Sequence, residues 1–498
     1  MPCVLAISLI TSEVDDLLSI DNALNLLQPA MVQLYITAAI FVALAGVSSF
    51  VSAMVISFPL TQRIATRIDH PHMVIPQQFR RQRHQYLSDH QPFAKTYNEN
   101  EPPLGPNSVS ITHRFAAYTV AVGIGTPPQM QSLLIDTGSS DLVVFSSASQ
   151  QCRASPWGCG GGYNPVASST YENLEKSFFF GFGNQSDTAR GSFVRDDMLL
   201  GDYLVRSQQF ALVEDSILDF DIEGVLGLGY KSMQQAEVKY DAVASKLYSY
   251  DVNPKPIYSL YLDSRHGQER PSQKSEKPLK PGSTNISECS SRRPSPYTLP
   301  KASLDLGFID ALKHFGDSMA FISCTSKHEF SVALSDITVP SSSTSKSVSL
   351  VDKKAGEMLN VLLDSGTIGI LITDAIADAI ARRISPLAVY DHSLPGYRLP
   401  CSSIPNTPGG YFEFTFSIDQ TIALTKSKTV KVAFSELYRE LNTTSHTPDD
   451  KKCMLDIVRE STYGIGNILG TAFLSSVYAV FDVEEHQVGI AQASYYNM

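Results

Sequence analysis

The sequence lacks two features that would indicate other kinds of protein. Lysine and arginine are too few to balance the acids, and the formal net charge of −11 over 498 residues argues against nucleic acid as a partner. The 11 histidines are scattered, and no HExxH pattern occurs. We therefore expect no metal site and no cofactor, so that the side chains themselves must supply any chemistry.

Charged residues are also absent from residues 22–62. The apolar part, residues 31–60, is long enough to span a bilayer, and a membrane anchor is one interpretation. Acids precede this stretch and arginines follow it, which by the positive-inside tendency would leave the rest of the chain in the cytoplasm. The sequence favours instead a signal peptide over residues 31–53, which ends at the small residues Val51-Ser52-Ala53. Translation would then start at Met31, which makes residues 1–30 a doubtful N-terminal extension.

Two segments share one pattern, an apolar run that ends in an acid, a hydroxyl residue and a glycine. They are residues 133–140, around Asp136, and residues 361–367, around Asp364. One such tripeptide alone is typical of a turn, but two behind aliphatic runs favour a paired site. Two buried acids that face each other can share a proton, so that one is neutral while the other is ionised. Such a pair can activate a water and protonate a leaving amine.

Around these segments the sequence resembles the pepsin-like aspartic proteases, from about Ala117 to Ala493. The matching stretches are residues 118–129, 225–229, 468–474, 478–482 and 488–491. In that family an apolar-apolar-Gly element crosses behind each acid-bearing loop, and the small glycine permits the close approach. The resemblance implies an all-β, bilobal pepsin-like aspartic protease fold, with two β-rich lobes and a cleft between them. The many short strands punctuated by turn residues agree with it.

The resemblance also implies an activity and its residues. The protein would be an aspartic endopeptidase, sensitive to pepstatin, whose catalytic residues are Asp136 and Asp364. Its substrate would be a peptide or protein, bound as an added strand. Among the supporting residues, Thr137 and Ser365 would brace the two loops by hydroxyl hydrogen bonds. Ser139 and Thr367 would donate to the outer carboxylate oxygens, and Gly138 and Gly366 would allow the loops to approach closely.

Residues 178–197 fall where the family has its flap hairpin, a mobile lid over the substrate. Phe180, Gly181 and Gly183 would be its substrate-binding residues, with Gly183 near the tip. The family usually has tyrosine in place of Phe180 and tryptophan in place of Val143, and these two hydrogen-bond to each other. Since both are replaced together, neither leaves a stranded partner, which predicts a repacked pocket. The alternative is a non-catalytic member of the fold that binds a protein or peptide.

Composition divides the rest of the chain. Residues 54–105 hold six basic side chains against four acids and four of the 11 histidines, which indicates a pro-segment that leaves the cleft in acid. A solvated linker is the alternative. An N-terminal lobe is expected over residues 110–263 and a C-terminal lobe over residues 302–498. Residues 264–300, rich in Ser, Pro, Lys and Arg, predict a disordered insert or, as the sharper alternative, a basic binding patch.

Cysteines and sequons complete the prediction. By resemblance to the family, and as local loops, Cys152–Cys159 and Cys401–Cys453 are expected disulfides, while Cys289 and Cys324 could pair or stay reduced. Possible glycosylation acceptors are Asn184, Asn285 and Asn442.

Together these features predict a secreted zymogen. Vacuolar residence and anchoring through residues 31–60 are the alternatives. We expect a monomer without stable membrane association once the signal peptide is removed.

Overall fold

The computed structural model describes the strand-rich part of the chain, all of it within the second of two units into which the chain divides, Ile68–Met498. The described residues are 108–114, 117–154, 159, 161–182, 187–217, 223–249, 256–264, 302–315, 319–340, 347–351, 358–405, 410–419, 426–441 and 451–494.

Several predictions of the sequence therefore lie outside the described residues. They are the N-terminal extension, the signal peptide or anchor, the pro-segment, the insert beyond Ser264, Gly183, Asn184, Asn285, Asn442 and the possible pairing of Cys289.

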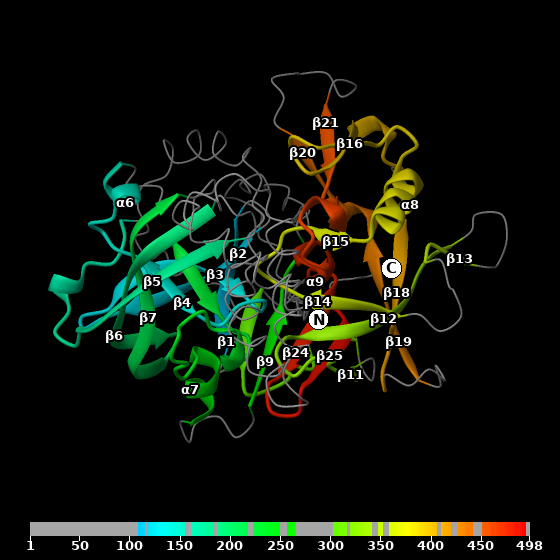
Figure 1. Ribbon diagram of the computed structural model, residues 1–498. Helices are drawn as coiled ribbons and strands as arrows, with labels where there is room; N and C mark the ends of the chain where they lie inside the picture. The colour runs from blue at the N-terminus through cyan, green and yellow to red at the C-terminus, as the bar shows by residue number, and fades with distance from the viewer. Residues whose placement is uncertain are drawn as a thin grey trace, which may run out of the picture. The chain divides into compact units, whose positions relative to one another are not determined.

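The predicted all-β architecture is confirmed, and its largest sheet has 13 strands in the order β11-β25-β24-β9-β10-β1-β2-β3-β8-β4-β7-β6-β5 (Figure 1). Its strands are β1 Ser108–Arg114, β2 Ala117–Ile124, β3 Gln129–Asp136, β4 Leu142–Phe145, β5 Glu172–Phe182, β6 Asp187–Leu200, β7 Tyr203–Ile217, β8 Gly224–Gly227, β9 Ile257–Tyr261, β10 Ser303–Leu306, β11 Ala320–Ser323, β24 Val477–Asp482 and β25 Gln487–Gln492. Because β24 pairs with β9, this sheet joins strands from both sides of the predicted boundary between the lobes.

A second sheet has eight strands, in the order β19-β18-β12-β14-β23-β15-β22 with β13 paired to β12. Its strands are β12 Ser331–Val339, β13 Val348–Ser349, β14 Leu359–Leu363, β15 Ile370–Ile372, β18 Tyr411–Ser417, β19 Ser427–Ala433, β22 Ile457–Arg459 and β23 Asn467–Leu469. A third sheet has four strands, in the order β16-β17-β21-β20. They are β16 Val389–Asp391, β17 Gly396–Pro400, β20 Tyr438–Leu441 and β21 Lys452–Leu455.

Helices are short in the described part of the chain. The α-helices are α6 Gln150–Ala154, α7 Val243–Ser249, α8 Asp374–Ile384 and α9 Thr471–Leu474. The 3-10 helices are η1 Pro165–Ala167, η2 Lys231–Met233, η4 Cys401–Ser403, η5 Phe434–Leu437 and η7 Glu460–Thr462. Within the residues that the structure describes, no helix has the length and apolar character needed to cross a membrane.

The alternation of side chains along β18 shows how the sequence builds the core. Its phenylalanines Phe412, Phe414 and Phe416 are fully buried, while the residues between them are only partly so. The ring of Phe473, from α9, lies 5.3 Å from that of Phe414 and 5.7 Å from that of Phe416. This aromatic packing holds α9 on the sheet, directly after β23, the strand that pairs with β14.

The described residues contain two disulfides, with the predicted pairings. Cys152 and Cys159 close a loop at α6, with their Cα atoms 5.3 Å apart. Cys401 in η4 and Cys453 in β21 form the other disulfide. They are 52 residues apart in sequence, and their Cα atoms are 5.0 Å apart.

Candidate active site

Each of the two predicted acids stands at the end of a buried strand that has a second strand beside it. Strand β3 ends at Asp136 and runs parallel to β8, so that Asp136 lies opposite Gly227. Strand β14 runs parallel to β23 in the same way and leads directly into Asp364. Backbone bonds tie both acids to these neighbours: Leu228 N donates to Asp136 O at 2.8 Å, and Asp364 N donates to Leu469 O at 3.1 Å.

The two crossing strands approach so closely that only glycine fits at one position of each. A Cβ atom on Gly227 would lie 2.7 Å from the backbone N and O of Asp141. A Cβ atom on Gly470 would lie 2.2 Å from the carbonyl oxygen of Thr367. Any side chain here would push the acid loops away from the strands behind them.

The two carboxyl groups receive matching sets of donors. The Oδ1 of Asp136 accepts the N–H of Gly138 at 2.8 Å, and its Oδ2 accepts the hydroxyl of Ser139 at 2.5 Å. Such bonds favour the ionised form of a carboxyl group.

Asp364 has the same arrangement. Its Oδ1 accepts the N–H of Gly366 at 2.8 Å, and its Oδ2 accepts the hydroxyl of Thr367 at 2.6 Å. The two loops thus present their acids in equivalent ways.

Hydrogen bonds between the loops hold them together. The hydroxyl of Thr137 donates to Leu363 O at 2.8 Å, and that of Ser365 donates to Ile135 O at 2.8 Å. Each backbone N–H of this pair also donates to the other residue's hydroxyl oxygen, at 3.1 and 3.0 Å. The structure thereby brings together all six supporting residues that the sequence suggests.

Both acids are shielded from solvent, with Asp136 2% and Asp364 0% exposed. Within the described ranges, no three His, Cys, Asp or Glu residues gather in a way that could hold a metal ion. The two acid loops thus present two buried carboxyl groups that are held by hydrogen bonds.

Strands β5 and β6 form the hairpin expected of a flap, and its aromatic side chains divide between two faces. Phe178 and Phe180 are buried, whereas Phe179 between them is 65% exposed. Phe180 belongs to one apolar cluster with Val143, Phe193 and Tyr240. Both departures from the family pattern, at positions 143 and 180, therefore meet in one apolar environment.

A model of the eukaryotic aspartyl protease family matches residues 117–273 and 298–493, well over half of the chain, including both acid loops. The chain belongs to the eukaryotic aspartyl proteases. The predicted family is thus confirmed.

Three relatives show how far the sequence of this aspartyl protease differs from those of other proteases. Secreted aspartic protease 7 of Candida albicans is 26% identical over 415 residues, which cover 78% of this chain and 62% of that protein. Secreted aspartic protease 3 of the same organism is 28% identical over 394 residues, 78% of this chain and 82% of that protein. An acid protease of Saccharomycopsis fibuligera is 29% identical over 394 residues, 78% and 84% of the two chains. The chain thus spans less than two thirds of the first relative's length.

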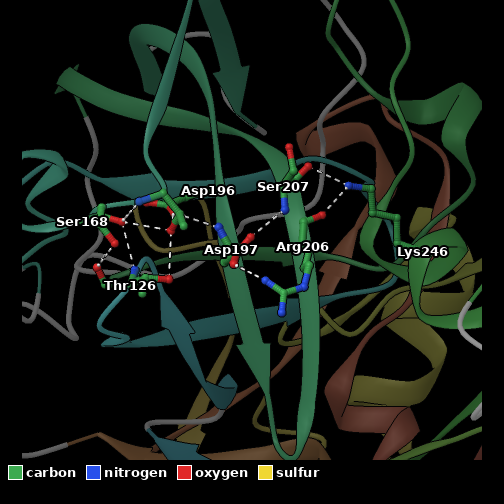
Figure 2. Close-up of polar contacts among 9 residues, drawn as sticks. Thr126, Ser168, Asp196, Asp197, Arg206, Ser207 and Lys246 are labelled. Carbon is green, nitrogen blue, oxygen red and sulfur yellow. Dashed lines mark hydrogen bonds and ion pairs between the residues drawn. The ribbon is translucent and has the colours of Figure 1, made fainter.

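The base of the hairpin in this aspartyl protease is fixed by a polar network (Figure 2). Oδ1 of Asp197 accepts the N–H of Ser207 at 2.9 Å, and its Oδ2 lies 3.4 Å from the guanidinium of Arg206. Lys246, from α7, donates to the carbonyl oxygens of Arg206 at 3.1 Å and Ser207 at 2.7 Å. Beside them, Oδ1 of Asp196 accepts the N–H of Asp197 at 2.8 Å. These contacts hold together the C-terminal end of β6, the N-terminal end of β7 and α7.

Another buried acid, which the sequence did not indicate, lies five residues after Asp136. Asp141 is 3% exposed and accepts the hydroxyl of Tyr240 at 2.6 Å and the N–H of Gln235 at 2.7 Å. Burial raises the pKa of its carboxyl group, although both donors oppose that shift. The second loop has Gly369 at the corresponding position, so the two loops differ here.

Proposed function

We propose that this protein is a secreted aspartic endopeptidase that hydrolyses peptide bonds at acidic pH through a water activated by Asp136 and Asp364. The observation that carries the proposal is the matched pair of buried carboxyl groups, each with an N–H and a hydroxyl donor, on two loops joined by reciprocal hydrogen bonds. Membership of the aspartyl protease family supports it.

In the proposed reaction, the two carboxyl groups share one proton, because two buried like charges cannot both be ionised at close range. The ionised group takes a proton from the water as it attacks the peptide carbonyl carbon. The protonated group stabilises the oxygen of the tetrahedral intermediate and the pair then protonates the departing amine. Ser139 and Thr367 each donate to one carboxyl oxygen and so help to keep it ionised.

The substrate is an extended peptide or protein segment held by backbone hydrogen bonds. The hairpin β5–β6, with Gly181 toward its outer end, closes over it and excludes water. The paired replacement leaves Phe180 and Val143 in one apolar cluster in place of a hydrogen-bonded pair, which is compatible with closure.

Secretion rests on different support. Two of the relatives are named secreted aspartic proteases, and the chain carries a candidate signal peptide and three sequons. Sequencing of the mature N-terminus tests this point: a start beyond residue 53 in culture medium agrees with secretion and processing, whereas a cell-bound chain that retains residues 31–60 indicates an anchor.

The activity is tested by cleavage of an unfolded protein substrate between pH 3 and 6, after acid treatment of the full chain, with and without pepstatin. Asp364→Asn serves as the inactive variant, and its melting temperature is compared with that of the wild type. We expect pepstatin-sensitive cleavage by the wild type and its loss by a factor of about 10³ or more in the variant. Folded, processed protein that cleaves nothing across this range would contradict the proposal and favour a peptide-binding protein.

A further inference from the structure

A continuous series of contacts leads from the first acid loop to the flap hairpin. It begins at Asp141, whose carboxylate accepts the Tyr240 hydroxyl at 2.6 Å. The ring of Tyr240 meets that of Phe193 in β6, with centroids 6.1 Å apart and the rings at 65°. Phe193 in turn lies 5.4 Å from Phe178 and 6.1 Å from Phe180, both in β5. The hairpin's inner aromatic face therefore rests on a ring that Asp141 holds.

The segment that carries Tyr240 is itself fastened to the acid loop. Gln235 N donates to Asp141 Oδ2 at 2.7 Å, and Tyr240 N donates to the side-chain oxygen of Gln234 at 2.9 Å. Just before this segment, Gly229 N donates to Ser139 O at 2.7 Å. Residues 234–240 thus form a short bracket with both ends fixed to the loop that bears Asp136.

All members of this series are buried, so their contacts are made without competition from water. Asp141 is 3%, Phe193 5% and Tyr240 9% exposed. Removing one partner of a buried hydrogen bond leaves the other without a partner, and edge-to-face aromatic pairs stabilise beyond the area they bury. The second acid loop has Gly369 where Asp141 stands, and so cannot form an equivalent bracket.

We propose that Tyr240, held by Asp141, is a positioning residue that couples the first acid loop to the hairpin β5–β6 and thereby sets how tightly the hairpin closes on a substrate. The inference rests on the proposed function for its kinetic consequence. In this protein, the aromatic contacts through Phe193 take the place of the hydrogen bond that the family has between positions 143 and 180.

Tyr240→Phe is the test variant, because it removes only the hydroxyl that Asp141 accepts. Tyr397→Phe is the matched control, since Tyr397 is also buried and also donates its hydroxyl to an aspartate, Asp378, but in the four-stranded sheet. For each acid-activated variant, kcat and KM for a peptide substrate are measured at one acidic pH. Amide hydrogen exchange of β5 and β6 is measured in parallel.

We expect Tyr240→Phe to raise KM about three- to tenfold with kcat within about twofold of the wild type. Exchange of the β5 and β6 amides should be faster by a similar factor, and Tyr397→Phe should change neither quantity. A purely structural role for Tyr240 would instead lower the active fraction, which reduces apparent kcat and leaves KM unchanged. That result, or an equal response of the Tyr397 control, would overturn the inference.

Two further arms keep the test decisive. If Tyr240→Phe does not fold, Phe193→Leu takes its place, since it interrupts the series without stranding a buried polar group. The same rise in KM supports the coupling, and an unchanged KM overturns it. If the wild type cleaves nothing, the proposed function fails, but the exchange comparison still decides whether Tyr240 controls the hairpin.

Discussion

Thr137 and Ser365 exchange hydrogen bonds across the two acid loops: Thr137 N donates to Ser365 Oγ at 3.1 Å, and Ser365 N donates to Thr137 Oγ1 at 3.0 Å. Each hydroxyl also donates to a carbonyl of the other strand, so each both donates and accepts one bond between the loops. The two halves of the site, 228 residues apart in sequence, are therefore held in register by four buried bonds.

Replacing Thr137 with valine should damage both stability and catalysis. The variant keeps the shape but leaves Leu363 O and Ser365 N without their buried partners, at a cost of about 2–4 kcal/mol in the free energy of unfolding. Displacement of one acid should reduce kcat about 10²-fold. Urea unfolding and peptide cleavage measure the two effects. Thr137→Ser retains the hydroxyl and is the control; an equal loss in that variant would mean that the methyl group matters instead.

Lys313 and Asp305 form a buried ion pair whose loss should be expensive. Lys313 Nζ lies 2.6 and 2.8 Å from the two oxygens of Asp305, and the side chains are 3% and 0% exposed. Ser108 and Tyr478 also donate to Asp305, but Lys313→Met leaves this buried carboxylate without its counter-charge and should lower the free energy of unfolding by about 3–5 kcal/mol.

The control for this variant is Lys231→Met, which removes an ion pair with Asp241 on the surface, where both side chains are largely exposed. Its cost should stay below about 1 kcal/mol. Chemical unfolding of both variants gives the comparison. Similar losses in the two would contradict the importance of burial.

The candidate site was largely predictable from the sequence because the same motif occurs twice in the chain. The repeated apolar run, acid, hydroxyl and glycine indicated both Asp136 and Asp364, and the crossing strands behind them followed from the resemblance. The hairpin and the two disulfides were also predicted from the resemblance to the family. These features depend on short local patterns that survive in a single sequence.

What could not be predicted depends on contacts between distant segments. Asp141 gave no signal, because its partners Gln235 and Tyr240 lie 94 and 99 residues further along the chain. The pairing of β24 with β9, which carries one sheet across the predicted lobe boundary, was hidden for the same reason. Sequence patterns state that a residue is buried, but not which distant residue buries it.

Asp263 should make the fold less stable as the pH rises. Its Oδ1 atom is buried without a hydrogen-bond partner in the described part of the chain, and burial, then nearby Glu436, raises the pKa of its carboxyl group. A folded-state pKa above the unfolded one means that the native state binds the proton more tightly. The stabilisation is complete below about pH 4, the ordinary range of an aspartate, and is lost as pH rises through the folded pKa.

Asp263→Asn should therefore match the wild type at pH 3 and be more stable than it at pH 6 in urea unfolding. Asp241→Asn is a control of opposite sign, because Lys231 lowers the pKa of Asp241. That variant should be less stable than the wild type at pH 6, and the difference should shrink toward pH 3. A stability difference at position 263 that does not vary with pH would show that ionisation there has no effect.

The two disulfides should differ in what their removal costs, because they close loops of very different length. Cys401–Cys453 spans 52 residues and Cys152–Cys159 only 7. In the loop-entropy model, replacing the first pair by serines lowers the free energy of unfolding by about 4 kcal/mol, and replacing the second by about 2 kcal/mol. The hydrogen bonds described at Asp136 and Asp364 come from other residues, so kcat at low temperature should stay within about twofold for both. Urea unfolding of the two double variants measures the difference. Equal costs would mean that native-state packing at the half-cystines, rather than restriction of the unfolded chain, accounts for their stabilisation.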